Sequence, residues 1–414
     1  MPSHSTSLLE PTSEGLDTQK PLRLLFAHNR YLNRGGEDES RDQEILLLRS
    51  KGHEVLEYEV DNKEISRSSY LSAGFQSIWN IEQQHRLTKF MQDTKPHILK
   101  VDNYFPILSP SVFSAAKRLG ISTVLSVRNY RLICPGTSLF RDGQICTDCV
   151  GSKLAVSAIR HQCYRGSYLQ SAAVALSNGF AHLLGTWEHS VDRYIAVSEF
   201  VKKELIRGGF PQDKISVKAN SIVDTGVGKG DGGYALFVGR LIPEKGVRTL
   251  LDAWQKIGAS LPLKIIGEGS LEDLVLGAAK INPAIEYLKR QPISQVCEYM
   301  GRATLLIFPS EWFEPFGRSI VEAYSKGTPV IGADTEPMRD MIEDGQTGLF
   351  FKAGDSDALA KTVLSLIGDK AQLSHMRDQA RRRYLSNYSA EENFAQMMTI
   401  FGHAMSTQQA SLSD

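Results

Sequence analysis

Four charged residues in the second half of the chain have types and spacings that suit the binding of phosphates and hydroxyl groups. Arg240 and Lys245 follow a short apolar segment, and such cations bind phosphate oxygens. Seven residues separate Glu314 from Glu322, so on one helix the two carboxylates would lie within about a quarter turn of one face. A carboxylate accepts hydrogen bonds from two vicinal hydroxyls, as ribose or hexose recognition requires. Together the four residues predict a nucleotide-sugar site.

The residues around Glu314 add a helix start and small side chains to this site. Pro315 suits the first position of a helix, which predicts a helix over residues 315–326 with Glu314 at its entrance. Backbone N–H groups around Gly317 are then free to bind an anion. Gly267 follows another apolar segment, where a small residue lets a ligand approach the backbone closely.

The elements that position these residues alternate between apolar strands and helical patterns. In the first half, strands are predicted at 22–27, 53–60, 97–101, 122–127 and 194–197. In the second half, strands are predicted at 234–238, 263–266, 285–288, 305–308 and 329–331, with helices at 247–257, 271–279, 294–300 and 315–326. This alternation is typical of α/β proteins, and it predicts two Rossmann-like, doubly wound domains. Such sheets bind ligands at the carboxyl ends of their strands.

A glycine-rich segment divides the two domains. Residues 221–233 contain five glycines and few large apolar side chains, which is typical of an exposed hinge, and we place the linker at 223–233. The first domain is then 21–222 and the second 234–388. Residues 1–20 are rich in Ser, Thr, Pro and Glu, and we expect a disordered leader there.

Composition and charge exclude several classes of protein. Lys+Arg and Asp+Glu both number 47, so no overall positive charge favours nucleic-acid binding. No apolar run reaches 18 residues and no secretory signal is recognisable, so we expect a cytoplasmic protein. The apolar segment 169–184 is too short to span a bilayer, and we expect it to pack in the core. Peripheral attachment to the inner face of a membrane is the alternative.

Residues 231–360 closely resemble the donor-binding domain of family 4 glycosyltransferases, which have the two-domain GT-B fold. The matching motifs are Val-Gly-Arg-Leu-Ile-Pro-Glu-Lys-Gly, Ile-Gly-Glu-Gly, Phe-Pro-Ser-Glu-Trp-Phe-Glu-Pro-Phe-Gly, Ala-Tyr-Ser-Lys-Gly-Thr-Pro-Val-Ile and Asp-Gly-Gln-Thr-Gly-Leu-Phe-Phe. The resemblance implies that Arg240 and Lys245 hold the donor diphosphate, Glu322 the ribose and Glu314 the transferred sugar. It also implies a retaining reaction without a catalytic metal.

The first half of the chain resembles the same family. Gly35-Gly36 looks like the glycine turn that approaches the donor phosphates across the cleft between the domains. Many relatives have a histidine where Asp102 or Arg128 stands here, so His28 is a substitute candidate and Arg128 a candidate contact to a phosphate. Candidate contacts to the acceptor or the sugar are His28, Asn29, Asp102 and Arg128. Candidate contacts to the donor are Gly35, Gly36, Arg240, Lys245, Gly267, Glu314, Phe316, Gly317, Arg318 and Glu322.

The expected activity is transfer of a hexosyl group from a UDP-, GDP- or ADP-sugar to a saccharide or lipid-linked acceptor, in polysaccharide or glycoconjugate biosynthesis. The donor would bind the second domain and the acceptor the first, with Glu314, Arg240 and Lys245 taking part in catalysis. The resemblance further implies that a helix at 389–405 crosses back to the first domain. We expect a disordered tail at 406–414. Alternatives are a sugar-nucleotide epimerase or phosphorylase of the same fold, a glycosidase, and a catalytically silent nucleotide-sugar binding protein.

Four of the five cysteines lie within 30 residues of one another. Cys134, Cys146, Cys149 and Cys163 include a Cys-x2-Cys pair, which suits a tetrahedral structural zinc ion. Because the outer spacings are loose, four buried or idle thiols are an equal alternative. No cofactor is expected to be required for catalysis.

Overall fold

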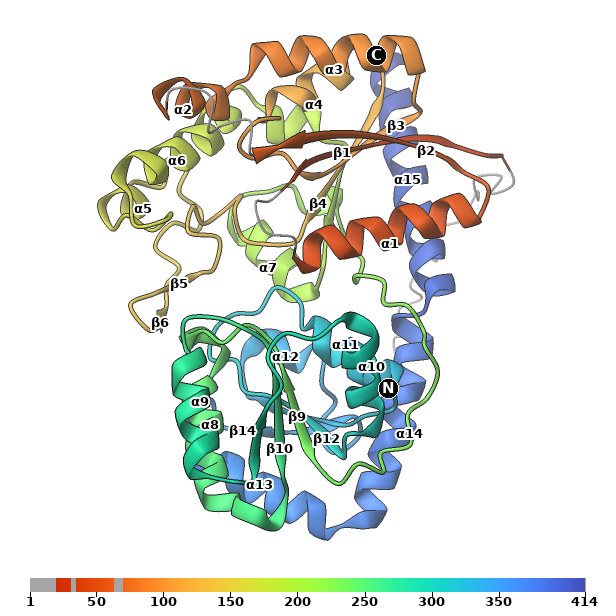
Figure 1. Ribbon diagram of the computed structural model, residues 1–414. Helices are drawn as coiled ribbons and strands as arrows, with labels where there is room; N and C mark the ends of the chain where they lie inside the picture. Colours follow the sequence, from red (N-terminus) through yellow and green to blue (C-terminus); the bar gives the residue numbers. More distant parts are fainter. Residues whose placement is uncertain (1–19, 31–34, 63–69, 414) are drawn as a thin grey trace, which may run out of the picture.

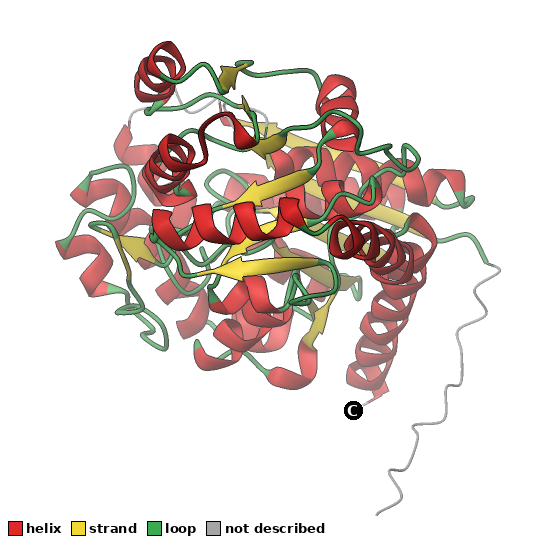
Figure 2. Cartoon of the chain, turned by 90° about the horizontal axis from the view of Figure 1, so that it is seen from below, coloured by secondary structure: helices red, strands yellow, loops and turns green. Residues whose placement is uncertain are grey.

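The computed structural model describes residues 20–30, 35–62 and 70–413. Residues 1–19 of the expected leader lie outside these ranges. Two domains, each built on a parallel sheet, follow one another along the chain, the first above the second in Figure 1. In the view from below, strands lie inside and helices lie on both sides of them (Figure 2). The predicted α/β architecture with two Rossmann-like domains is confirmed.

The first domain has six parallel strands in the order β2-β1-β3-β4-β7-β8. The strands are β1 (Arg23–Arg30), β2 (Glu54–Asp61), β3 (Ile98–Asn103), β4 (Ser122–Val127), β7 (Arg193–Ala196) and β8 (Ile215–Val217). The helices between them are α1 (Gly36–Ser50), α2 (Tyr70–Ile78), α3 (Ile81–Thr94), α4 (Ser111–Arg118) and α7 (Glu199–Arg207). An insertion between β4 and β7 holds the hairpin β5 (Phe140–Arg141) and β6 (Gln144–Ile145), then α5 (Val156–Arg160) and α6 (Tyr168–Leu183).

The second domain repeats this plan with the strand order β11-β10-β9-β12-β13-β14. The strands are β9 (Ala235–Val238), β10 (Leu263–Ile266), β11 (Ile285–Tyr287), β12 (Leu305–Phe308), β13 (Val330–Ala333) and β14 (Gly348–Phe351). The helices are α8 (Val247–Ile257), α9 (Glu272–Ile281), α10 (Ile293–Arg302), α11 (Arg318–Ser325), α12 (Glu336–Arg339), α13 (Ser356–Gly368) and α14 (Lys370–Asn387).

Apolar patterning explains both sheets. Strands β3, β4 and β12 are buried along their whole length, as parallel strands covered on both faces must be. Helix α8 buries Val247, Leu250, Leu251 and Trp254, which share one face at a spacing of three and four residues.

The helix predicted over 315–326 begins three residues later than expected. Helix α11 starts at Arg318 because Gly317, with φ −80° and ψ 72°, is not helical. The carbonyl of Pro315 instead accepts a hydrogen bond of 2.8 Å from Ser198 Oγ of the first domain. Glu314 therefore lies in a loop that contacts the first domain, and not at a helix entrance.

The chain returns to the first domain through α15 (Ala390–Ser413), drawn in blue beside the upper sheet in Figure 1. Met397 and Phe401 pack there against Leu24 and Phe26 of β1. The disordered tail expected at 406–414 is wrong for residues 406–413, which continue the helix. Gln408 is only 4% exposed, and its Oε1 accepts a hydrogen bond of 2.6 Å from Lys117 Nζ.

Candidate functional site

Each sheet has a switch point, at which the strand order reverses and the loops after two neighbouring strands come from opposite sides. The reversal lies between β1 and β3 in the first sheet and between β9 and β12 in the second. Ligands of open α/β sheets bind beside the carboxyl ends of the strands at such points. Gly35 follows β1, Arg240 and Lys245 follow β9, and Glu314 follows β12. The predicted site residues therefore lie where the topology favours a ligand.

Lys245 and Glu314 form an ion pair between these two loops of the second domain. Glu314 is buried, and its Oε1 also accepts a hydrogen bond of 2.9 Å from Ser310 Oγ. Lys245 Nζ lies 5.7 Å and 5.8 Å from the ring centroids of Phe308 and Trp312. The pair places a cation and a carboxylate side by side, one suited to a phosphate and the other to hydroxyl groups.

Two glycines allow the loops to approach one another closely. Gly246 has φ +66°, and a Cβ atom there would lie 1.9 Å from the carbonyl oxygen of Pro309 after β12. Gly267 has φ +153°, and a Cβ atom there would lie 1.8 Å from the carbonyl oxygen of Gly239 after β9. Only glycine fits such positions without strain. Arg240, next to Gly239, is exposed.

Arg318 joins the start of α11 to the first domain. Its guanidinium donates to Glu322 Oε1 at 2.8 Å, to the carbonyl of Gly36 at 3.3 Å and to Ser40 Oγ at 3.0 Å. It also pairs with Glu39 at 3.1 Å. Burial raises the pKa of Glu322, and the charge of Arg318 opposes that shift. The glycine turn of the first domain therefore lies next to Arg318 and Glu322 of α11.

The surroundings of Phe316 and Gly317 differ from the expected anion site with free backbone N–H groups. Phe316 is half-buried and packs against core residues of both domains. Gly317 is buried and its N–H points to Met341 Sδ at 3.2 Å, while the N–H of Arg318 donates to the Phe316 carbonyl at 3.0 Å. These two N–H groups are therefore engaged within the protein.

His28 and Asn29, at the end of β1, are buried and hold other parts of the first domain. His28 Nε2 lies 2.8 Å from Asp38 Oδ1, and the N–H of Gly35 donates to Asp38 Oδ2 at 2.9 Å. Asn29 Oδ1 accepts a hydrogen bond of 2.7 Å from the N–H of Ile107. His28 thus supports the glycine turn through Asp38.

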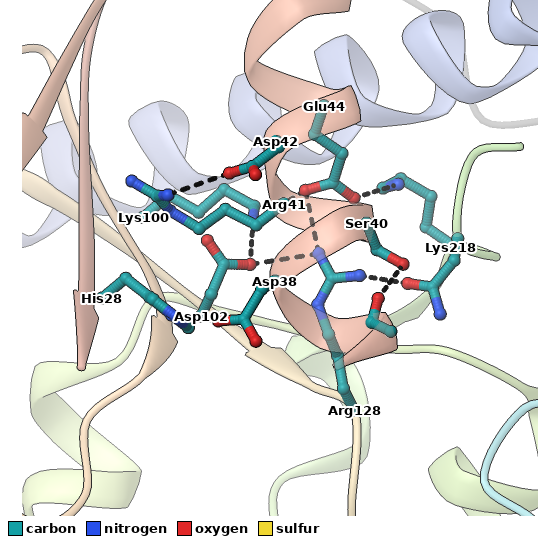
Figure 3. Close-up of polar contacts among 12 residues, drawn as sticks. His28, Asp38, Ser40, Arg41, Asp42, Glu44, Lys100, Asp102, Arg128 and Lys218 are labelled. Atoms are coloured by element: carbon teal, nitrogen blue, oxygen red, sulfur yellow. Dashed lines mark hydrogen bonds and ion pairs between the residues drawn. The ribbon is translucent and has the colours of Figure 1, made fainter. Parts of the chain in front are cut away.

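Asp102 and Arg128 belong to a buried ion network, which comprises Glu44, Lys100, Asp102, Arg128 and Lys218 (Figure 3). Asp102 Oδ1 lies 2.5 Å from Lys100 Nζ and 3.1 Å from Arg128 Nη2. The Glu44 carboxylate lies 2.9 Å from Lys100, 3.0 Å from Arg128 and 2.8 Å from Lys218. Asp102 and Arg128 are both buried and paired with protein groups, and their contacts to a ligand stay a prediction.

Each charge of this network depends on its partners. Burial alone would raise the pKa of Glu44, but Arg128, Lys100 and Lys218 hold it well below its ordinary value. Burial lowers the pKa of Lys218, and Glu44 opposes that shift. Asp102 and Arg128 also line a cavity of about 20 Å³. A volume of that order holds roughly one water molecule.

Glu44, Lys100 and Lys218 were not anticipated as important residues. One signal was present: Lys100 interrupts the apolar run of β3, where a strand buried on both faces leaves no route to water. Tyr130 was also missed. It is buried at the domain interface, and burial with the nearby charges of Glu314 and Glu204 raises its pKa.

The four clustered cysteines carry free thiols. Burial, with smaller contributions from Cys134, Cys163 and Cys146, raises the pKa of Cys149 to about 11. In the part of the chain that the structure describes, no three His, Cys, Asp or Glu side chains are arranged to hold a metal ion. The structural zinc site stays a prediction.

Comparison with known proteins agrees with this architecture. The glycosyl transferases group 1 family model matches residues 225–383. An uncharacterised glycosyltransferase of Methanocaldococcus jannaschii is 29% identical over 43% of this chain and 50% of its own length. A phosphatidyl-myo-inositol mannosyltransferase of Mycobacterium leprae is 28% identical over 50% of this chain and 56% of its own length. The matches thus span about half the length of these curated relatives.

The fold extends over almost the whole chain. The crystal structure of Anabaena HepE in complex with UDP has a TM-score of 0.65 and 16% identity, covering 92% of this chain and 100% of that one. No helix among residues 20–30, 35–62 and 70–413 is long and apolar enough to cross a bilayer. Residues 225–383 thus match the glycosyl transferases group 1 family model, within a chain whose two parallel-sheet domains have the GT-B fold.

Proposed function

We propose that the protein is a glycosyltransferase that moves a hexosyl group from a nucleoside-diphosphate sugar to a saccharide or lipid-linked acceptor. The observation that carries this proposal is the pairing of Lys245 with Glu314 beside the bridge from Arg318 to Gly36. It puts groups for phosphate and for sugar hydroxyls at the switch points of both sheets. Among the structural neighbours, HepE was crystallised with UDP and with UDP-glucose, which supports a nucleotide-sugar donor.

In the proposed reaction, the bond between the anomeric carbon and the diphosphate oxygen breaks, the acceptor oxygen bonds to that carbon, and the proton of the acceptor hydroxyl passes to the departing diphosphate. Negative charge then develops on the departing diphosphate. Arg240 and Lys245 stabilise this charge more in the transition state than in the ground state, without a metal ion. When Lys245 turns to the phosphate, the Glu314 carboxylate is released to accept hydrogen bonds from the sugar. Retention of configuration is proposed from the likeness to family 4 enzymes.

Glu322 and Arg318 bind the nucleoside end of the donor in this proposal. The Glu322 carboxylate accepts from the two ribose hydroxyls, and Arg318 holds that carboxylate in place from 2.8 Å. The matched relatives include a mannosyltransferase that acts on phosphatidyl-myo-inositol and a capsular polysaccharide glycosyltransferase of Staphylococcus aureus. We therefore propose polysaccharide or glycoconjugate biosynthesis as the setting.

Donor binding is tested first by thermal shift with UDP-glucose, GDP-mannose and ADP-glucose. A ligand at 100 times its Kd adds about 2.7 kcal/mol, which corresponds to about 5–10 °C for a domain of this size. Arg240→Ala is expected to remove most of that shift. Arg302→Ala is the matched control, because Arg302 is exposed and lies before β12, at the opposite edge of the sheet. No shift with any nucleotide sugar would contradict the proposal.

Transfer is tested by release of nucleoside diphosphate from the donor that binds, with candidate saccharide acceptors. Glu314→Gln is expected to lower turnover on the order of 100-fold or more, while Glu286→Gln, an exposed control in β11, leaves it unchanged. Isomerisation of the donor without an acceptor would indicate an epimerase. Binding without any turnover would indicate a nucleotide-sugar binding protein, and hydrolysis of glycosides without a nucleotide would indicate a glycosidase.

A further inference from the structure

Helix α6 carries its large apolar side chains on the outside of the molecule. Leu169 and Leu183 are 75% and 81% exposed, and Leu176 and Phe180 are exposed between them. These four residues recur at intervals of three, four and seven, so they form one stripe on the helix surface. The expectation that segment 169–184 packs in the core is wrong for this stripe, which we call the outer stripe.

The inward face of α6 consists of small apolar and polar residues, which are Ser171, Val174, Ala175, Ser177, Asn178 and Ala181. Asn178 accepts a hydrogen bond of 3.0 Å from the Tyr104 hydroxyl and donates one of 2.6 Å to the Arg131 carbonyl. Ser177 Oγ donates to the carbonyl of Ser77 at 2.8 Å. A surface helix normally turns its apolar side inward. Helix α6 buries its small apolar residues Val174, Ala175 and Ala181 and makes buried hydrogen bonds, while its largest apolar side chains face outward.

Neighbouring elements extend the outer stripe into an apolar surface. Phe75 of α2 is 74% exposed, and the Trp79 ring contacts the Phe180 ring at 5.7 Å between centroids. Val156 of α5 is also exposed. Helices α2, α5 and α6 lie together at one edge of the first domain, away from the second domain (Figure 1).

Cations predominate on this surface, where the acidic Asp148 pairs with Arg141 and Glu188 with His182. Residues 150–187 contain no Asp or Glu, and their three cations Lys153, Arg160 and Arg165 are all exposed. Gly179 brings one of them against the helix, because a Cβ atom there would lie 3.0 Å from the Lys153 carbonyl oxygen. Two copies of the surface facing each other would oppose cation to cation, which disfavours a symmetric dimer.

We propose that this surface docks onto a bilayer that contains anionic lipid, with α6 lying in the headgroup region. Interfacial helices combine large apolar side chains on one side with Lys and Arg nearby, and the cations bind anionic headgroups. Helix α6 has 16 residues, fewer than the roughly 20 that a spanning helix needs. This inference goes beyond the proposed transfer reaction and does not depend on it.

The test is flotation of the purified full chain with vesicles. Vesicles of phosphatidylcholine with one third phosphatidylglycerol are expected to carry the protein upward, and vesicles of phosphatidylcholine alone to carry much less. The double variant Leu169→Gln/Leu183→Gln is expected to lower partitioning on the order of tenfold or more. Neutralising Lys153 or Arg160 with Gln is expected to lower it about fivefold each. Ile281→Gln, 85% exposed on α9 of the second domain, is the control and is expected to bind normally.

Three results would overturn the proposal. The wild-type protein could remain in the bottom fraction with the anionic vesicles, or the double variant could float as well as the wild type. The third is self-association by light scattering that the double variant abolishes, with no flotation, which would make the surface an interface between copies. The substituted side chains are exposed, so the variants should keep the wild-type melting temperature. Donor-induced thermal shifts, measured separately, test the transfer reaction alone.

Discussion

Replacing Glu44 by Gln is expected to destabilise the first domain severely. The Glu44 carboxylate lies within 3.0 Å of three buried cations, Lys100, Lys218 and Arg128. Without its charge, Asp102 is the one carboxylate of the buried ion network left to face them. Breaking a buried ion pair from one side costs about 3–5 kcal/mol, because it leaves uncompensated charge away from water. For a unit of this size, that corresponds to a melting temperature lower by about 6–20 °C.

The assay is calorimetric melting of the wild type, Glu44→Gln and the control Glu54→Gln. Glu54 pairs with Arg23 at 2.6 Å, but both side chains are largely in contact with solvent. Such surface pairs contribute less than about 1 kcal/mol, so the control should melt within a few degrees of the wild type. A melting temperature of Glu44→Gln equally close to that of the wild type would refute the reasoning.

The pH dependence of stability gives an independent test of the role of Glu44. The folded-state pKa of Glu44 lies well below its ordinary value, so its stabilising effect is present above that ordinary value. The effect is lost as the pH falls through the lowered folded-state pKa. The difference in melting temperature between wild type and Glu44→Gln should therefore persist from neutral to mildly acidic pH and disappear in strong acid. A gap that widens on acidification would contradict this assignment.

Three further predictions follow from single features of the structure. Gly246→Ala should lower the melting temperature of the second domain by several degrees and weaken donor binding, because the added Cβ meets the Pro309 carbonyl; melting with and without donor checks both. Burial raises the pKa of Glu322, so donor affinity measured by calorimetry should fall on acidification at a higher pH than an ordinary Glu would give, and Glu322→Gln should remove that dependence. Phe401→Ala should cost about 3–5 kcal/mol in unfolding experiments, because Phe401 is fully buried between α15 and the first sheet.

Much of the fold could be predicted because apolar patterning is a local property. Strands β4, β10 and β12 and helix α8 occupy the predicted residues, and the other predicted strands differ by a few residues at their ends. The start of α11 was predicted wrongly because Pro315 suits a loop as well as a first helical turn. Pro315 lies in a loop because its carbonyl accepts a hydrogen bond from Ser198, which is more than a hundred residues away in the chain. Sequence alone does not show such a partner.

In the candidate site, too, some residues could be placed from the sequence and others could not. Arg240, Lys245 and Glu314 could be placed together because each follows a strand of one parallel sheet, and the strand ends meet at one edge. Asp102 lies near the end of β3 and Arg128 follows β4, yet they pair with Glu44 and Lys100 inside the protein. Lys100 lies in the same strand as Asp102, but Glu44 comes from α1, far away in the chain. Likewise, the apolar composition of α6 does not reveal that its large side chains face outward.

The buried ion network also bears on how the two domains can move. Lys218, where the chain leaves the first domain, binds Glu44 and donates to Asn393 Oδ1 at 2.8 Å, where the chain returns in α15. Asn393 in turn donates to the carbonyl of Ala219 at 2.7 Å. Both crossings are thus fixed to α1, the helix that begins at Gly36 and meets Arg318. Because these contacts tie Lys218, Ala219 and Asn393 to the first domain, we expect that the second domain rotates about residues beyond Asn220 when the two domains close on a ligand. Loss of the Glu44 charge should then loosen the glycine turn and the hinge together.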